Sequence, residues 1–186
     1  MGPALPPQRL AVAADVPRIG ALMRAAILDL FPAFYDERQV ASGARYIAEP
    51  DLTLIEDGTY YVHETGGEIV ACGGWSKRDK LYTGSGEAGG DARLLVPATE
   101  PARVRAMFVR SDWTRRGIGR AILDACERDA RAAGFRRLAL MATLPGEQLY
   151  RACGFRETDR VMIPMPDGVE LAGVAMEREI TAGGRV

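Results

Sequence analysis

The sequence predicts a mixed α/β protein with one, mostly antiparallel sheet flanked by helices, and three observations lead to this fold class. Hairpin patterns lie at residues 59–75 and 161–176, which argues against a parallel, doubly wound sheet. Helical and strand patterns alternate between the hairpins, as is typical of an α/β protein. The length of 186 residues and the hydrophobic fraction of 47% suit one globular domain.

The N-terminal half is expected to contain two helices followed by a hairpin. Asp15 can cap a helix that carries Pro17 in its first turn, and apolar residues recur along it with the helical period. Residues 65–67 form the turn of the hairpin, and Gly73 with Gly74 indicates a bulge or a close backbone approach. The expected elements are a strand at 9–13, helices at 15–30 and 36–49, and strands at 59–64 and 68–75.

The C-terminal half follows a long loop and has stronger patterns. The loop at 79–100 is rich in glycine and unusually long, so we expect it to be a mobile part of a ligand site. Gly134 ends a long amphipathic helix, and Pro145-Gly146 breaks the strand before a short helix. The expected elements are a strand at 103–109, a helix at 117–133, a strand at 137–141, a short helix at 147–152, and strands at 161–165 and 169–176.

Charge and hydropathy argue against several partner classes. The net charge is −1, so the protein as a whole does not attract nucleic acid or an anionic membrane. No apolar run approaches the roughly 20 residues of a membrane span, and the N-terminus lacks a signal-peptide pattern. We therefore expect no nucleic-acid or membrane partner and a cytoplasmic location. Locally, residues 103–137 hold ten arginines and four acidic residues, which suits either a small polyanion or a solvated helix face.

The cysteines and the single histidine do not form a recognisable metal or nucleophile site. Cys72, Cys126 and Cys153 are far apart and show no C-x-x-C motif, so reduced, mostly buried thiols are expected. His63 lies in a strand pattern without a catalytic serine or cysteine signature, which favours a structural role. One histidine with scattered cysteines cannot build a usual zinc site, and we expect no metal.

The stretch at residues 109–123 carries the clearest chemical signal. A strand ends, a polar turn follows, and Gly117 and Gly119 open an amphipathic helix. The first N–H groups of such a helix have no intrahelical partner, and the helix dipole favours an anion there. Arg115, Arg116 and Arg120 add positive charge, so the pattern predicts a pyrophosphate-binding turn.

Two other phosphate-binding motifs fail on spacing. A dinucleotide fingerprint needs a third glycine where Ile122 stands, and a Walker loop needs Gly-Lys-Ser/Thr where Gly119-Arg120-Ala121 stands. A bare G-x-G at a helix start is weak by itself. Its position after a strand and beside an arginine pair favours a binding role.

Two motifs resemble those of the GCN5-related N-acetyltransferases (GNAT). Residues 114–119 resemble the family's acyl-CoA signature, Gln/Arg-x-x-Gly-x-Gly/Ala, and residues 149–155 resemble its Leu-Tyr-x-x-x-Gly-Phe. One helix and one strand separate the motifs, as in the family. The resemblance covers roughly residues 9–178 and implies an acyl-CoA N-acyltransferase fold. We accordingly expect an extended lead-in at 1–8, an N-acetyltransferase domain at 9–180 and a tail at 181–186.

The resemblance assigns roles to individual residues. The backbone of Met107, Phe108 and Val109 would pair with the pantetheine arm and the acetyl carbonyl of acetyl-CoA. Tyr150 would stand near the thioester sulfur and protonate the leaving thiolate as general acid. The residues implied to bind acetyl-CoA are Met107, Phe108, Val109, Arg115, Arg116, Gly117, Ile118, Gly119, Arg120, Thr143 and Tyr150.

The chain also departs from the family pattern. Thr114 stands where the signature has Gln or Arg, and Thr143 stands where many members have Asn. Arg103 and Leu138 occupy strand positions where some members carry a catalytic glutamate, so no general base carries over. The nearby carboxylates, each more often a surface group than a base, are Glu64, Glu87, Asp91 and Glu100. We expect the acceptor site between the first two helices and the long loop. The aromatic candidates for its wall are Tyr35, Tyr46, Tyr60, Trp75 and Tyr82.

The resemblance implies transfer of an acetyl group from acetyl-CoA to a primary amine of a small molecule or peptide, by direct attack of the neutral amine. A second interpretation is a non-catalytic acyl-CoA-binding regulatory module, which the absent glutamate favours weakly and Tyr150 disfavours. The identity of the amine and the preferred acyl group stay open, and so does a homodimeric assembly.

Overall fold

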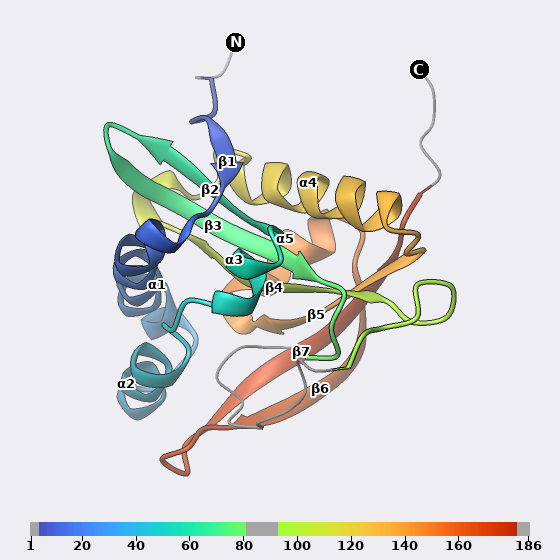
Figure 1. Ribbon diagram of the computed structural model, residues 1–186. Helices are drawn as coiled ribbons and strands as arrows, with labels where there is room; N and C mark the ends of the chain where they lie inside the picture. Colours follow the sequence, from blue (N-terminus) through green and yellow to red (C-terminus); the bar gives the residue numbers. More distant parts are fainter. Residues whose placement is uncertain (1–3, 81–92, 182–186) are drawn as a thin grey trace.

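The computed structural model describes residues 4–80 and 93–181, and in these residues seven strands form one sheet with helices against both faces (Figure 1). The strands are β1 (Gln8–Leu10), β2 (Tyr60–Thr65), β3 (Glu68–Ser76), β4 (Ala102–Val109), β5 (Arg137–Thr143), β6 (Arg156–Pro164) and β7 (Glu170–Glu179). The helices are α1 (Val16–Leu30), α2 (Glu37–Tyr46), α3 (Leu52–Glu56), α4 (Ile118–Ala132) and α5 (Leu144–Ala152), with 3₁₀ turns η1 (Ala13–Asp15), η2 (Phe31–Ala33) and η3 (Ser111–Trp113). No helix of the described residues is long and apolar enough to cross a membrane.

The sheet is mixed and mostly antiparallel, as predicted. Its strand order is β1-β2-β3-β4-β5-β7-β6. Within the described residues β4 and β5 are the one parallel pair, and the hairpins β2–β3 and β6–β7 lie on either side of them. The switch from antiparallel to parallel pairing is therefore at the centre of the sheet.

Alternation along the strands divides the core into two layers. Leu138 and Leu140 of β5 pack with α4 and α5 on one face, whereas Met141 points to the other face, where α1 and α2 pack. Successive side chains of a strand point to opposite faces, so this arrangement follows directly from the apolar run in β5. Figure 1 shows α4 and α5 on one side of the sheet and α1 and α2 on the other.

The largest differences from the predicted elements have local causes. Helix α3 was not expected, because a five-residue helix that buries only Leu54 shows no periodic pattern. Helix α5 begins at Leu144, so Pro145 and Gly146 lie in its first turn rather than in a break before it. Strand β6 begins at Arg156, earlier than expected, because nearly all of this edge strand is exposed and carries no apolar alternation. Much of the expected 79–100 loop, residues 81–92, lies outside the described residues.

Candidate active site

Strand β4 carries an extra residue at the centre of the sheet. Ala106 and Met107 of β4 lie opposite Gly73 of β3, and Ala106 adopts a φ of +54°, which residues other than glycine rarely do. A Cβ added at Gly73 would lie 2.5 Å from the Cγ of Met107, so the bulge needs a glycine there. The backbone irregularity predicted from Gly73 and Gly74 is confirmed.

The bulge coincides with a separation of the two parallel strands. β4 and β5 pair only at their N-terminal ends, through Ala102 with Leu138 and Arg103 with Ala139. Beyond these pairs, the edge of β4 that faces β5 has no strand partner in the described part of the chain. Backbone N–H and C=O groups at such an edge are available to a bound molecule.

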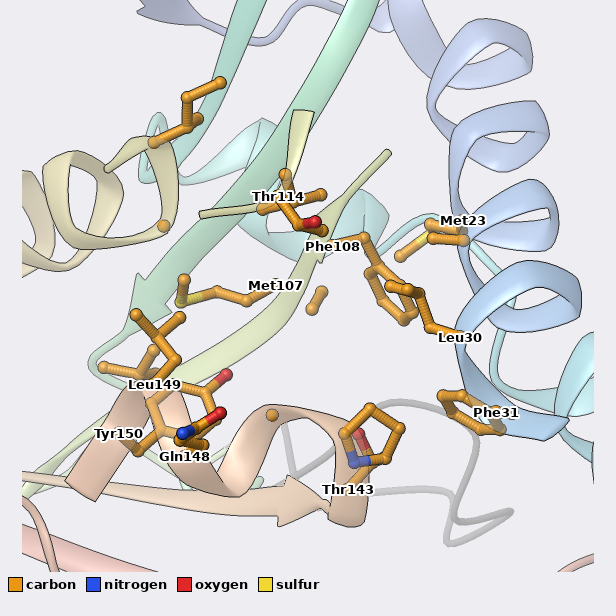
Figure 2. Close-up of a pocket in the computed structure, with 18 of the residues that line it drawn as sticks. Met23, Leu30, Phe31, Met107, Phe108, Thr114, Thr143, Gln148, Leu149 and Tyr150 are labelled. Atoms are coloured by element: carbon orange, nitrogen blue, oxygen red, sulfur yellow. The ribbon is translucent and has the colours of Figure 1, made fainter. Parts of the chain in front are cut away.

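A cavity of about 500 Å³ lies at this separation, a size usual for small-molecule sites. It is lined by β4, the turn before α4, and α5, and also by side chains from α1 and β6, so its lining comes from both faces of the sheet. Figure 2 shows Met107, Leu149 and Tyr150 on one side of it and Met23, Leu30 and Phe31 on the other. The predicted binding residues that line it are Met107, Phe108, Val109, Arg115, Gly117, Ile118, Gly119, Arg120, Thr143 and Tyr150.

The turn before α4 presents backbone donors to this cavity. Its N-cap, Gly117, has a φ of +88° and no side chain to occupy the first N–H groups of the helix. A Cβ added there would meet no atom within 4 Å, so the space above the turn is open. Arg115 and Arg120 line the cavity beside this helix start, where free N–H groups and positive charge favour an anion. We call residues 114–120 the cradle.

Arg116 is the one predicted binding residue that does not line the cavity. Its guanidinium lies over the ring of Trp113, 4.5 Å from the ring centroid, and it is Trp113 that contributes to the lining. A cation over an indole face is a stable arrangement, so this side chain has a structural partner inside the protein.

Tyr150 lies in the last turn of α5 and is buried. Its ring meets Phe155 edge to face at a centroid distance of 5.8 Å. Its hydroxyl makes no hydrogen bond to another described residue, and burial raises the pKa of the phenol. The phenol therefore stays protonated at neutral pH, and Tyr150 lines the cavity.

Comparison with known proteins places the chain in a family. The model of the Acetyltransferase (GNAT) family matches residues 24–155, well over half of the chain. The chain belongs to the GNAT family. The structure also resembles solved GNAT proteins, which at under 25% identity supports the fold alone.

Two of these solved structures cover nearly the whole chain. A GCN5-related N-acetyltransferase from Rhodopseudomonas palustris aligns with a TM-score of 0.74 and 19% identity over 96% of this chain and 98% of that one. The PaiA N-acetyltransferase of Thermoplasma acidophilum, solved with coenzyme A, aligns with a TM-score of 0.64 and 14% identity over 93% of this chain and 98% of that one.

A curated relative matches over a shorter stretch. The aminoglycoside N(6')-acetyltransferase type 1 of Stenotrophomonas maltophilia is 41% identical over 58 residues, which are 30% of this chain and 38% of that protein. The match thus spans well under half of the relative's length.

The carboxylates considered as GNAT general bases are committed to ion pairs elsewhere or lie outside the described residues. Glu64 forms ion pairs with Arg9 and Arg18, which lower its pKa, and Glu100 forms an ion pair with Arg93. Glu87 and Asp91 fall among residues 81–92. None of the described residues that line the cavity is Asp or Glu, and no cluster of three metal-binding side chains occurs in the described ranges.

The two strand positions where some GNAT members have a glutamate also serve packing and charge pairing. Arg103 pairs with Asp79 at 3.1 Å, and Leu138 is fully buried in the core on the α4 face. His63 is buried as well, with its Nδ1 2.8 Å from the Pro6 carbonyl, and does not line the cavity. The three cysteines are free, buried thiols, as expected.

None of the four described aromatic residues expected to line an acceptor site contributes to this cavity. Tyr60 is fully buried and donates to the Ala106 carbonyl at 2.9 Å, and Trp75 packs edge to face on Phe135. Neither these two nor Tyr35 and Tyr46 line the cavity. Tyr82 lies outside the described residues. Large aromatic side chains in strands and helices belong more often to the core than to the wall of a binding site. Here Tyr60 and Trp75 are core residues.

The cavity wall opposite Tyr150 consists instead of residues that the sequence did not single out. They are six apolar side chains from α1, η2, β5, β6 and the turn after β6, and we call them the apolar lobe: Met23, Leu30, Phe31, Met141, Ile163 and Met165. Each of them sits in an ordinary core pattern of its own element. No local signal distinguishes such a residue from any other core residue.

Proposed function

We propose that the chain transfers the acetyl group of acetyl-CoA to a primary amine of a small molecule or peptide. The observation that carries the proposal is the convergence of three features on one cavity: the open edge of β4, the cradle and Tyr150. Each supplies one requirement of the reaction, namely binding of the thioester arm, binding of the pyrophosphate and a proton for the leaving thiolate.

The cavity residues fit acetyl-CoA. The open N–H groups of the cradle, with Arg115 and Arg120, would hold the pyrophosphate through charge-assisted hydrogen bonds. The unpaired edge of β4 would hold the amides of the pantetheine arm by strand-like pairing. A β4 backbone N–H near Met107 would also stabilise negative charge that develops on the carbonyl oxygen. The proposed reaction needs no metal.

Tyr150 is the proposed general acid. Its phenol is buried, protonated at neutral pH and without a competing hydrogen-bond partner among the described residues. Proton transfer from a placed side chain typically accelerates a reaction by about 10²–10⁴. Direct attack by the neutral amine leaves no step for a protein nucleophile, which agrees with buried cysteines and a buried, hydrogen-bonded His63.

The alternative is a binding module that holds acyl-CoA without catalysis. The test is amine-dependent release of free coenzyme A from acetyl-CoA, with mass spectrometry of the amine. We expect release to depend on both the amine and the protein and to yield the N-acetyl product. If calorimetry shows tight binding of acetyl-CoA but no amine causes release of free coenzyme A, the binding module is supported instead.

The remaining expectations concern partners and location. The matched relative is named for aminoglycosides, so an aminoglycoside belongs in the panel of amines. We propose the cytoplasm, where acetyl-CoA and reduced thiols occur together, and no nucleic-acid or membrane partner. Sedimentation of the purified chain distinguishes a monomer from a homodimer.

A further inference from the structure

We propose that the acceptor is a monoamine with an apolar body that occupies the apolar lobe, a proposal that rests on the acetyl transfer proposed above. The lobe lies on the α1 face of the sheet, whereas the cradle lies at the N-terminus of α4 on the other face. A donor held at the cradle brings its thioester to the gap between β4 and β5. The acceptor then reaches the thioester from the side of the lobe.

The surface that receives the acceptor is apolar. Leu30 and Met141 are the half-buried members of the lobe, whereas Met23 and Phe31 expose 0% and 3% of their surface and Ile163 and Met165 each expose 5%. The four buried side chains therefore form the packed apolar layer behind the accessible wall. Figure 2 shows Met23 and Leu30 beside Phe108, with Phe31 below them, on the side of the cavity opposite Tyr150. Several methionines in one wall give an adaptable surface suited to aliphatic and aromatic groups.

Charge on the cavity wall argues against a polycation. The charged side chains of the described lining are Arg105, Arg115 and Arg120, all of them cationic. Arg105 is paired with buried Asp51 at 3.1 Å, so its charge is compensated within the protein. An acceptor with several ammonium groups would have to desolvate each of them without a carboxylate from this part of the wall.

The same apolar wall accounts for the chemistry of the nucleophile. Only the neutral amine can attack the thioester carbonyl and form the C–N bond. The tetrahedral intermediate loses its ammonium proton to water, and the C–S bond then breaks. The thiolate takes a proton from Tyr150, and water returns a proton to the phenolate. An apolar environment disfavours an ammonium ion and lowers the pKa of a bound amine. The lobe therefore favours the reactive form although no described carboxylate lines the cavity.

The test compares amines of similar basicity that differ in length or in a second amino group, with acetyl-CoA as donor. We expect kcat/KM for hexylamine to exceed that for hexamethylenediamine at least tenfold, because the second ammonium would enter the lobe. Hexylamine should also exceed ethylamine at least tenfold, since each buried methylene strengthens binding about fourfold. Equal values, or a preference for the diamine or for kanamycin, would overturn the proposed acceptor class while leaving acetyl transfer intact.

A matched pair of variants locates the effect in the lobe. Leu30→Glu places a carboxylate in the cavity at a half-buried position, and it should lower the preference for hexylamine over the diamine at least tenfold. Leu28→Glu makes the same change on the same helix at a half-exposed position outside the cavity and should leave the preference unchanged. An unchanged preference in Leu30→Glu, with the variant folded by circular dichroism, would contradict the assignment.

Two further measurements separate this proposal from the reaction on which it rests. Calorimetry with coenzyme A present should show N-hexylacetamide binding at least tenfold more tightly than N-ethylacetamide, whether or not turnover occurs. Equal binding would overturn the apolar lobe as the acceptor site, and so would a preference for hexanoyl-CoA over acetyl-CoA. Failure of every amine to release coenzyme A, with acetyl-CoA bound, would instead overturn the proposed function and this acceptor with it.

Discussion

The two ends of the cavity are built in different ways. The cradle is made by the backbone of one short stretch, residues 114–120, whose conformation depends on the glycine at position 117 and on a helix start. The apolar lobe is made by side chains from five separate segments, among them Met23 of α1 and Ile163 of β6. The donor end therefore tolerates most side-chain changes but few backbone changes. The acceptor end can change its specificity by single side-chain substitutions without loss of the cradle.

The most disruptive single change is expected at the cradle. Gly119→Glu brings a negative charge to the helix N-terminus, and even a Cβ there would lie 2.7 Å from Cδ2 of Leu149. We expect affinity for coenzyme A to fall about 100-fold, the equivalent of one strong charge-assisted hydrogen bond. Calorimetry with coenzyme A measures this.

Gly119→Gln is the matched control because it has the same bulk without the charge. Its loss should be about tenfold smaller, and Thr114→Ala should have little effect, since the backbone rather than that side chain forms the cradle. Normal coenzyme A binding by a folded Gly119→Glu protein would remove the donor site from this end of the cavity and with it the contrast between the two ends.

Tyr150→Phe tests the point where donor and acceptor meet. The ring and its contact with Phe155 remain, and the lost hydroxyl has no hydrogen bond among the described residues, so stability should be unchanged. We expect kcat to fall at least about tenfold with little change in KM for acetyl-CoA, because the proton is needed only as charge develops on sulfur. Single-turnover kinetics should be measured, so that chemistry is known to limit the rate.

The pH dependence of the wild-type protein sharpens the same assignment. Burial raises the pKa of Tyr150 above its usual value near 10, so the acid form persists to higher pH. The rate should therefore rise as the amine deprotonates and show no alkaline decline up to about pH 10. A decline below pH 9 that is absent in Tyr150→Phe would show that the phenol ionises too readily for this role.

Tyr35 connects the two ends, although it lines neither. Its hydroxyl donates to the Ala172 carbonyl at 2.7 Å and accepts from the Leu144 N–H at 2.9 Å, which fixes the first turn of α5. Tyr35→Phe leaves both groups without this partner and should lower the free energy of unfolding by about 2 kcal/mol. Because α5 carries Tyr150, kcat should fall a few-fold while coenzyme A affinity stays constant. Equal activity at temperatures well below unfolding would limit Tyr35 to a stabilising role.

The contrast also shows what a sequence reveals. The pattern of the cradle is contiguous, so Gly117 and Gly119 predicted both the start of α4 and an anion site, and the strand patterns predicted the mixed sheet. The positions of Tyr60 and Trp75 depend on long-range packing that no local pattern encodes, and both are core residues rather than acceptor wall. The lobe was missed for the same reason, because Met141 or Ile163 is indistinguishable from other core residues until the fold brings them together.

The smallest effect is expected at Arg116, the one predicted binding residue whose side chain lies outside the cavity. The motif places Arg116 among the residues that hold pyrophosphate, whereas the side chain stacks on Trp113 and does not line the cavity. Arg116→Ala should therefore lower coenzyme A affinity only about twofold, through a looser Trp113 and the loss of one nearby charge.

Arg120→Ala is the comparison variant, because it removes a cation that does line the cavity. It should lower coenzyme A affinity about fivefold, with a weaker dependence of binding on salt than in the wild type. Calorimetry of both variants at two salt concentrations decides between the two assignments. If Arg116→Ala loses as much affinity and as much salt dependence as Arg120→Ala, the Arg116 guanidinium leaves Trp113 when the ligand binds and faces the pyrophosphate as a further cation.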